Sequence, residues 1–217
     1  MSRSVKLRVA VFDLDGTLVN SLPLVLRSIA YAIAPFAAHP TMDIFAKLGG
    51  PPESFMPNLV GDPRHVREAI TRMDAFHREN GHLIEPFDGV RGVLAQLHER
   101  GVLTAIWTGR DRESTEPLLV THGLAEAFSV VLCGDDLPSH KPDPEGLRTI
   151  MARLGVVAAE TIFVGDADVD VLGGAACGVD TVLIRHAREV ESAVRTKAWR
   201  MVDEPREAYD LVLGCAG

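Results

Sequence analysis

Two aspartates stand directly after the first apolar run of the chain, and their spacing is the first sign of chemistry. The run Leu7–Phe12 is short and rich in β-branched residues, and the turn Asp13-Leu14-Asp15-Gly16-Thr17 ends it. A run of this kind that stops at a polar, glycine-bearing turn predicts a buried strand. Two carboxylates at the end of a buried strand are costly unless a cation lies beside them. Because hard divalent cations such as Mg²⁺ prefer oxygen ligands, the pattern indicates a metal site, with an ordinary Asp-Gly turn as the alternative.

Three further sets of polar residues follow later apolar runs. They are Thr108-Gly109-Arg110 after Val102–Trp107, Lys141-Pro142 in the loop after Ser129–Leu132, and Gly165-Asp166-Ala167-Asp168-Val169-Asp170 after Thr161–Val164. The carboxyl ends of the strands in a parallel sheet lie at one edge. We therefore expect two aspartate clusters, a hydroxyl group beside a glycine, and a lysine to converge on one crevice.

Each set also has an ordinary structural explanation. Thr108-Gly109 fits simple turn chemistry. The acids of 166–170 fit the first turn of a helix, where negative charge is favoured. A lone lysine is usually a surface residue. However, only four of the 22 basic residues are lysines, so a lysine followed by a proline at Lys141 indicates a need for a compact point charge.

The wider chain predicts an α/β fold. The apolar runs alternate with segments of helical periodicity, and Thr181–Ile184 is the last of five such runs. Asp143-Pro144 predicts a helix start, with the aspartate as N-cap. Strands that alternate with helices indicate a parallel sheet. The expected helices are Val90–Arg100, Ser114–His122, Pro144–Leu154 and Val169–Cys177.

One interval breaks this alternation. Between Ser21 and Pro86 the sequence has no strand-like run, and glycine and proline clusters separate helical segments. These segments are Leu22–Phe36, Met42–Leu48 and His65–Phe76. We therefore expect residues 21–86 to form an all-helical domain inserted after the first strand. Residues 1–20 and 87–217 are expected to form the α/β core.

The composition argues against several partners and compartments. The formal net charge of −8 argues against nucleic acid or an anionic membrane as a general partner. The three cysteines have an odd count and no CxxC spacing, which argues against a disulfide framework or a zinc site. No signal peptide and no stretch of membrane-spanning length is visible, so a cytoplasmic protein is expected. The P-loop and G-x-G-x-x-G patterns are missing from the sequence, which argues against a nucleotide cofactor.

Taken in order, the polar sets resemble the four motifs of the haloacid dehalogenase superfamily. The matches are Asp13-x-Asp15-Gly16-Thr17, then Thr108-Gly109, then Lys141-Pro142, then Gly165-Asp166 with Asp170 four residues on. The resemblance covers nearly the whole chain, and the helical interval has the place of the family's helical (C1-type) cap. Gly49-Gly50-Pro51-Pro52 and Pro86-Phe87-Asp88-Gly89-Val90 are similar to segments of its phosphoglycolate phosphatase-like group. The resemblance implies a Rossmann-like parallel-sheet core with an inserted cap.

The resemblance also implies a metal-dependent mechanism. Asp13 would be the nucleophile that forms an aspartyl-phosphate, and Asp15 would act first as general acid and then as base. Asp13, the backbone carbonyl of Asp15 and Asp166 would hold Mg²⁺. Asp170 would steady this arrangement from outside the ligand shell.

Further positions would bind the substrate. Thr108 and the amide of Gly109 would hydrogen-bond the transferring phosphoryl group. Lys141 would neutralise its charge and keep the nucleophile ionised. Gly49 and Gly50 of the cap would lie at the substrate.

Three residues keep open roles. Arg110 stands where relatives often carry lysine, Asp168 is an extra acid expected at the surface, and Lys47 is either a surface residue or a contact for the far end of the substrate.

The aspartate at position 15 separates the reactions of this superfamily. Its dehalogenases lack it, because they release no alkoxide that needs a proton, so Asp15 favours phosphoryl transfer. We therefore expect a Mg²⁺-dependent phosphatase that acts on a small phosphorylated metabolite, with phosphoglycolate as the leading substrate. A sugar phosphomutase of the β-phosphoglucomutase type and a non-catalytic binding protein on the same fold are the alternatives. The sequence leaves the oligomeric state open.

Overall fold

The computed structural model describes residues 5–36 and 52–217 and divides into two compact units. The first unit comprises Met1–Asn20 and Glu85–Gly217, and the second comprises Ser21–Ile84. The sequence-based boundary was drawn after Pro86. The structure assigns Glu85–Pro86 to the first unit instead, because they form strand β3, which pairs with β2 (Val19–Asn20) in an antiparallel ladder.

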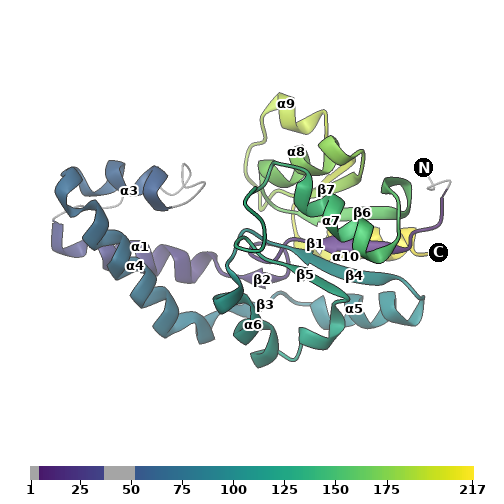
Figure 1. Ribbon diagram of the computed structural model, residues 1–217, viewed down its shortest axis with the longest axis horizontal. Coiled ribbons are helices and arrows are strands. Elements are labelled where there is room, and N and C mark those ends of the chain that lie inside the picture. Colours follow the sequence, from purple (N-terminus) through teal and green to yellow (C-terminus); the bar gives the residue numbers. More distant parts are fainter. Residues whose placement is uncertain (1–4, 37–51) are drawn as a thin grey trace. The chain divides into compact units, whose positions relative to one another are not determined.

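A parallel sheet of six strands forms the centre of the first unit (Figure 1). The strand order is β5-β4-β1-β6-β7-β8. β1 therefore lies between β4 and β6, and all of its side chains are buried, as expected for a strand covered on both faces. The strands are β1 (Val9–Phe12), β4 (Leu103–Trp107), β5 (Val130–Leu132), β6 (Thr161–Gly165), β7 (Asp180–Ile184) and β8 (Arg200–Val202).

Helices cover both faces of this sheet (Figure 1). Helices α7 and α8 contact each other on one face, and α5 and α10 contact each other on the other. The helices of the unit are α5 (Val90–Glu99), α6 (Arg112–Thr121), α7 (Glu145–Leu154), α8 (Asp168–Cys177), α9 (Ser192–Arg195) and α10 (Pro205–Cys215). The predicted N-cap is wrong by one residue, because α7 begins at Glu145 and Pro144 is its N-cap; the carboxylate of Asp143 still accepts the N–H of Glu145 at 2.9 Å.

Trp107 anchors the core between the sheet and α7. Its ring centroid lies 5.3 Å from that of Phe163, within a buried cluster that includes Leu147 of α7. Gly146 and Gly173 lie against the indole, where a Cβ atom at either position would overlap the ring. The last residue of β4 is therefore fixed from three sides, directly before the Thr108-Gly109 loop.

The second unit is all helical. Helix α1 packs along α4, and α3 also contacts α4. Their shared core includes Ile29, Ile33, Met56 and Ala69. The elements are α1 (Leu22–Ile33), α3 (Pro52–Val60) and α4 (Val66–Asn80), with 3₁₀ turns at Ala34–Phe36, Pro63–His65 and Gly81–Leu83.

The expected α/β class with a parallel sheet is confirmed, but several elements differ, and β2, α9 and α10 were not among those expected. Strand β8 was not expected, because Arg200-Met201-Val202 is short and only half-buried. The interval expected to lack strands ends in β3. Helix α3 begins at Pro52, where the sequence predicted a break, because proline is tolerated in the first turn of a helix. The expected helix Met42–Leu48 lies outside the described residues. Over the described part of the chain, no helix combines the length and apolarity that a membrane crossing requires.

Candidate active site

The loops that carry the predicted residues follow neighbouring strands of one sheet edge. Asp13 follows β1, Thr108 follows β4, and Asp166 follows β6. These three strands are adjacent in the sheet, and Lys141 lies in the loop that leaves β5, the next strand. The expected convergence at the carboxyl edge is therefore present in the order of the strands.

Lys141 joins two buried carboxylates. Its Nζ donates to Oδ1 of Asp13 and to Oδ1 of Asp170, each at 2.7 Å. The side chains of Lys141 and Asp13 are 8% and 10% exposed, and that of Asp170 is 1% exposed, so the charges are largely shielded from water. The second oxygen of Asp170 accepts the N–H of Ala167 at 2.9 Å. The ammonium group also lies 5.1 Å from the centroid of Trp107, whose position in the core was described above.

Burial and crowding of charge shift the pKa values of this group. Burial raises the pKa of Asp13 to about 7, although Lys141 acts to lower it. Burial, with the charges of Asp13 and Asp170, raises the pKa of Asp166 well above its usual value. Burial alone would lower the pKa of Lys141, but its two carboxylate partners outweigh this and raise it. The site therefore carries more negative charge than its lysine neutralises.

These acids could hold a cation. Asp13, Asp166 and Asp170 each offer an oxygen, and the three oxygens lie within 4.8 Å of one another. An all-oxygen set suits a hard divalent ion such as Mg²⁺. Gly16 has a φ of 72°, and a Cβ there would overlap the Asp166 carboxylate, so this glycine leaves the room that the carboxylate occupies. The residues fit the expected metal, and the set also includes an oxygen of Asp170, which the resemblance placed outside the ligand shell.

The side chain of Asp15 has a different partner. Arg110 binds it through both carboxylate oxygens, with Nη2–Oδ1 at 2.6 Å and Nε–Oδ2 at 3.0 Å. The guanidinium side chain is 10% exposed and that of Asp15 is 34% exposed. Burial alone would lower the pKa of Arg110, but the charge and hydrogen bond of Asp15, with the charges of Asp111 and Asp13, together outweigh this and raise it. Only an open role was expected for Arg110, although it directly follows Thr108-Gly109.

Thr108 and Gly109 form a tight corner beside Lys141. Thr108 is buried, its N–H donates to the carbonyl of Leu132 at 3.0 Å, and its Oγ1 accepts the N–H of Arg110 at 3.1 Å. A hollow of about 20 Å³ is lined by Thr108, Gly109, Lys141 and residues of the loop after β5. The corner thus presents a hydroxyl group and a lysine to a small space.

The remaining predicted residues divide into two groups. Gly49, Gly50 and Lys47 lie outside the described residues. Asp168, expected at the surface, is 38% exposed and binds Arg188 at 2.6 Å. Arg188 has no signal in the sequence that sets it apart from the other arginines.

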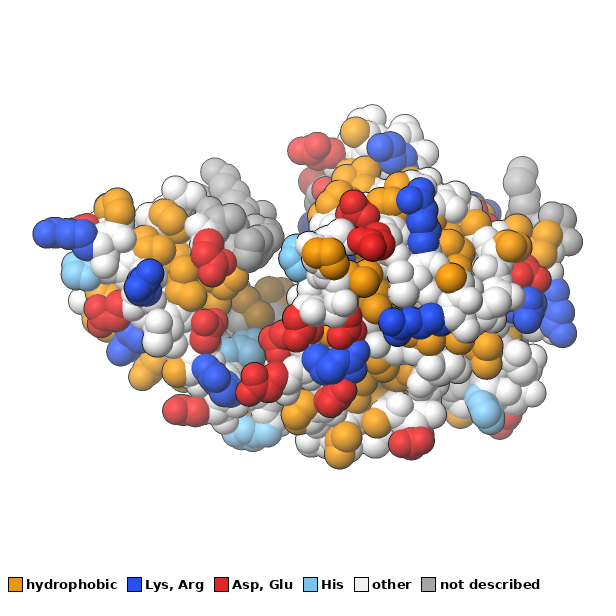
Figure 2. All heavy atoms as spheres, in the orientation of Figure 1, with side chains coloured by type: hydrophobic (Ala, Val, Ile, Leu, Met, Phe, Trp, Pro, Cys, Tyr) orange, Lys and Arg blue, Asp and Glu red, His pale blue; other side chains and the backbone are white. Residues whose placement is uncertain are grey.

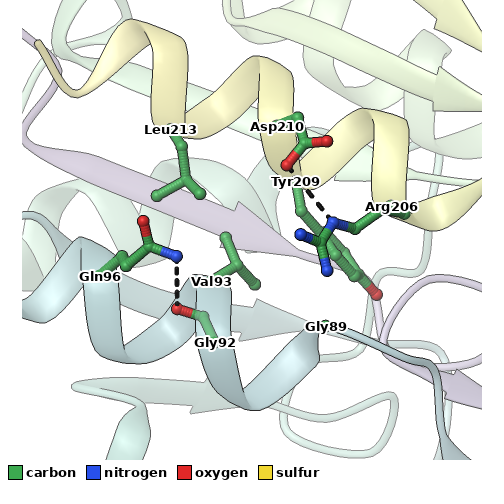
Figure 3. Close-up of a pocket in the computed structure, with 8 residues that line it drawn as sticks. All are labelled: Gly89, Gly92, Val93, Gln96, Arg206, Tyr209, Asp210 and Leu213. Carbon is green, nitrogen blue, oxygen red and sulfur yellow. Dashed lines mark hydrogen bonds and ion pairs between the residues drawn. The ribbon is translucent and has the colours of Figure 1, made fainter.

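A second hollow lies between α5 and α10, and neither Asp13 nor Asp166 lines it. It measures about 50 Å³ and is lined by residues that include Gln96, Arg206, Asp210 and Tyr209 (Figure 3). Two of its polar groups are already engaged, because Gln96 donates to the carbonyl of Gly92 and Arg206 pairs with Asp210. The Tyr209 hydroxyl reaches the carbonyl of Thr17 at 2.5 Å and so links α10 to the turn after β1.

The charged surface is mixed. Figure 2 shows acidic and basic side chains interspersed over the visible face of the first unit. Among the described residues on that face, no continuous basic surface of the kind that binds nucleic acid is visible.

Comparisons with known proteins cover most of the chain. The family model described as haloacid dehalogenase-like hydrolase matches residues 10–184. Pyrophosphatase PpaX of Halalkalibacterium halodurans is 34% identical, over 88% of this chain and 89% of that protein. A phosphoglycolate phosphatase of Cupriavidus necator is also 34% identical, over 84% of this chain and 83% of that protein. The crystal structure of a predicted phosphoglycolate phosphatase from Haemophilus somnus aligns with a TM-score of 0.82 at 21% identity, over 96% of this chain and 99% of that one, which is a likeness of fold.

Proposed function

The chain belongs to the haloacid dehalogenase-like hydrolase family and is a phosphatase within it, and we propose that it hydrolyses a small phosphomonoester with the help of Mg²⁺. The main support for this proposal is a cluster in which one lysine contacts two buried aspartates and a third aspartate lies next to them. Lys141 holds Asp13 and Asp170, and the Asp166 carboxylate lies within the same cluster of oxygens. Three aspartates around one lysine carry net negative charge, so they can bind an anionic substrate only when a divalent cation offsets that charge.

Asp13 is the proposed nucleophile. Its carboxylate is buried and fixed by Lys141, so little rearrangement is needed before it attacks phosphorus. The attack forms a bond from an Asp13 oxygen to phosphorus and breaks the bond from phosphorus to the leaving oxygen. Lys141 lies beside the forming acyl phosphate and stabilises its negative charge.

Asp15 is the proposed proton carrier. It gives a proton to the leaving oxygen, and as a carboxylate it then takes a proton from the water that hydrolyses the aspartyl-phosphate. The two contacts with Arg110 favour the ionised form and hold its orientation. This pairing therefore suits the role of base, which Asp15 would have in the second step.

Mg²⁺ would be held by Asp13, Asp166 and the backbone carbonyl of Asp15, with Asp170 beside them. When bound, it would neutralise charge on the phosphoryl oxygens and on the aspartates. Thr108 and the Gly109 amide would hydrogen-bond the phosphoryl oxygens from the side of the hollow that they line.

The substrate proposal rests on the relatives. Phosphoglycolate leads, because one of the relatives at 34% identity is a phosphoglycolate phosphatase, and pyrophosphate follows from PpaX. We also propose that the helical unit Ser21–Ile84 acts as a cap that selects the substrate. Its support is that it has its own core and is inserted as one piece between β2 and β3.

A phosphate-release assay tests the function. The purified protein is offered phosphoglycolate, pyrophosphate and sugar phosphates, each with Mg²⁺ or with excess EDTA. We expect release of phosphate that depends on Mg²⁺ and falls to background in Asp13→Asn. Asp210→Asn is a matched control on α10, far along the chain from the acids, and should retain activity. Full activity in EDTA or in Asp13→Asn would contradict the mechanism, and isomerisation of a sugar phosphate without phosphate release would indicate a phosphomutase.

A further inference from the structure

The segment that follows β7 has an unusual backbone. Among the described residues other than glycine, His186 and Ala187 are the ones with positive φ, at 48° and 61°. A Cβ atom makes this region sterically unfavourable for residues other than glycine. Two such residues in succession persist only where surrounding contacts fix them, and strain of this kind is concentrated at functional sites. We call Arg185–Arg188 the 185–188 strap.

The strap is fastened to β8. The N–H of Arg185 donates to the carbonyl of Val202 at 2.8 Å, and the N–H of His186 donates to the carbonyl of Asp203 at 3.1 Å. The Arg185 side chain also pairs with Asp203 at 2.6 Å. The N–H of Arg188 closes the turn on the carbonyl of Arg185 at 2.9 Å. The strap is therefore attached to the sheet edge by three contacts and closed by its own turn.

Two side chains of the strap contact the turn after β1 and the loop after β6. Nε2 of His186 lies 2.7 Å from the carbonyl oxygen of Gly16, and since a carbonyl can only accept, the ring nitrogen donates. Nη2 of Arg188 donates to the carbonyl of Asp166 at 3.1 Å and to Oδ1 of Asp168 at 2.6 Å. One contact holds the turn after β1, and the other holds the loop after β6.

These loops carry the acids that converge on one point. Gly16 follows Asp15 directly, and its missing Cβ leaves room for the Asp166 carboxylate, so a small shift of either loop changes the spacing of the cluster. Neither His186 nor Arg188 belongs to that cluster. They contact backbone carbonyls of the two loops, and Arg188 also contacts the Asp168 carboxylate, which is not part of the cluster.

We propose that His186 and Arg188 are positioning residues that set the distance between the Asp13–Thr17 turn and the Asp166 loop, and thereby the affinity of the site for Mg²⁺. The inference rests on the metal site of the proposed function. Residues that orient ligands from outside the shell typically change metal affinity by about 10- to 100-fold when they are removed.

Two effects of removing Arg188 predict opposite changes in the affinity for Mg²⁺. Arg188 is a cation beside a cation site, so Coulomb repulsion alone predicts that its removal strengthens Mg²⁺ binding. If Arg188 positions the loop, its removal weakens Mg²⁺ binding, because the carbonyl of Asp166 and the carboxylate of Asp168 lose the donor that they share. The direction of the change therefore separates the two effects.

The test is the melting temperature as a function of Mg²⁺ concentration, which reports binding without turnover. We expect Arg188→Ala to raise the Mg²⁺ concentration for half-maximal stabilisation by about 10- to 100-fold. His186→Asn should raise it by less. Asparagine adopts left-handed backbone readily, so this variant removes the contact with Gly16 and keeps the backbone of the strap. Arg195→Ala is the matched control, since Arg195 donates to the carbonyl of Val190 and should leave the curve unchanged.

Unchanged or tighter Mg²⁺ binding in both Arg188→Ala and His186→Asn would overturn the proposal, as would a wild-type protein that Mg²⁺ does not stabilise. If Arg188→Ala does not fold, His186→Asn alone decides. Mg²⁺ stabilisation that depends on Arg188, in a protein that releases no phosphate, would contradict the proposed function and support the positioning role.

Discussion

Arg110 grips Asp15 through both carboxylate oxygens, at 2.6 and 3.0 Å, although the two residues lie on different loops of the sheet edge. A planar guanidinium matches a carboxylate in this way and fixes its orientation as well as its charge. Arg110 therefore orients Asp15, the proposed proton carrier, and takes no part in the proton transfer itself.

The first prediction follows from this pair. Asp15→Asn should lower turnover of an alkyl phosphate by about 10²- to 10⁴-fold, the usual contribution of general acid–base catalysis. The loss should be smaller with p-nitrophenyl phosphate, because its leaving group needs little protonation. Arg110→Ala should lower turnover in the wild type and add little in the Asp15→Asn background, because it acts through Asp15. Equal losses from Arg110→Ala in both backgrounds would show that Arg110 acts elsewhere.

The second prediction concerns Lys141 and stability. Lys141→Met removes the partner of two buried carboxylates, and breaking a buried ion pair in this way costs about 3–5 kcal/mol. Urea unfolding in EDTA measures the loss. Adding Asp170→Asn should recover part of it, because one uncompensated charge is removed. A double variant that is less stable than Lys141→Met would contradict the charge argument.

The third prediction is a pH dependence of stabilisation by Mg²⁺. Burial raises the pKa of Asp13 to about 7 and that of Asp166 well above its usual value. For an acid whose pKa is higher in the folded state, the stabilising contribution is present below the unfolded value of about 4 and is lost as the pH rises through the folded value. Mg²⁺ competes with these protons, so the rise in melting temperature on adding Mg²⁺ should be larger at pH 8 than at pH 5.5. The difference should shrink in Asp166→Asn, and an equal rise at both pH values would count against the assignment.

The fourth prediction compares two glycines with similar backbone. Gly16 and Gly178 have φ values of 72° and 69°, but a Cβ at Gly16 would overlap the Asp166 carboxylate, whereas nothing lies within 4 Å of one at Gly178. Gly178→Ala should therefore cost only the conformational penalty of about 1–2 kcal/mol and leave Mg²⁺ binding intact. Gly16→Ala should cost more and also weaken Mg²⁺ binding. Thermal melts with and without Mg²⁺ give both quantities, and normal Mg²⁺ binding in Gly16→Ala would show that the room beside Asp166 is not needed.

Much of the fold followed from local pattern. The apolar run before Asp13 and the run that ends at Trp107 are long enough to identify buried strands, and a parallel sheet then brings their ends together. Strand β8 escaped notice because it is only half-buried at the sheet edge, where apolar residues are not required. The acids were singled out because costly groups stood at strand ends, and Lys141 because a lysine followed by a proline is unusual in a chain whose basic residues are mostly arginine. Contacts that depend on tertiary placement, such as Arg188 with the carbonyl of Asp166, leave no pattern in the sequence, because a surface arginine and a positioning arginine look alike.

The pairing of β2 with β3 has a consequence for how the chain could be edited. Val19 pairs with Pro86 and Asn20 pairs with Glu85 in this short ladder. Both chain connections to the helical unit Ser21–Ile84 therefore start from these two paired strands. Directly opposed residues on antiparallel strands lie about 4.5–5.5 Å apart, a gap that a short turn can close. The helical unit could therefore be replaced between Asn20 and Glu85 by another helical unit or by a short turn. Such a replacement would leave the register of β1 and β6, which precede the acids, unchanged.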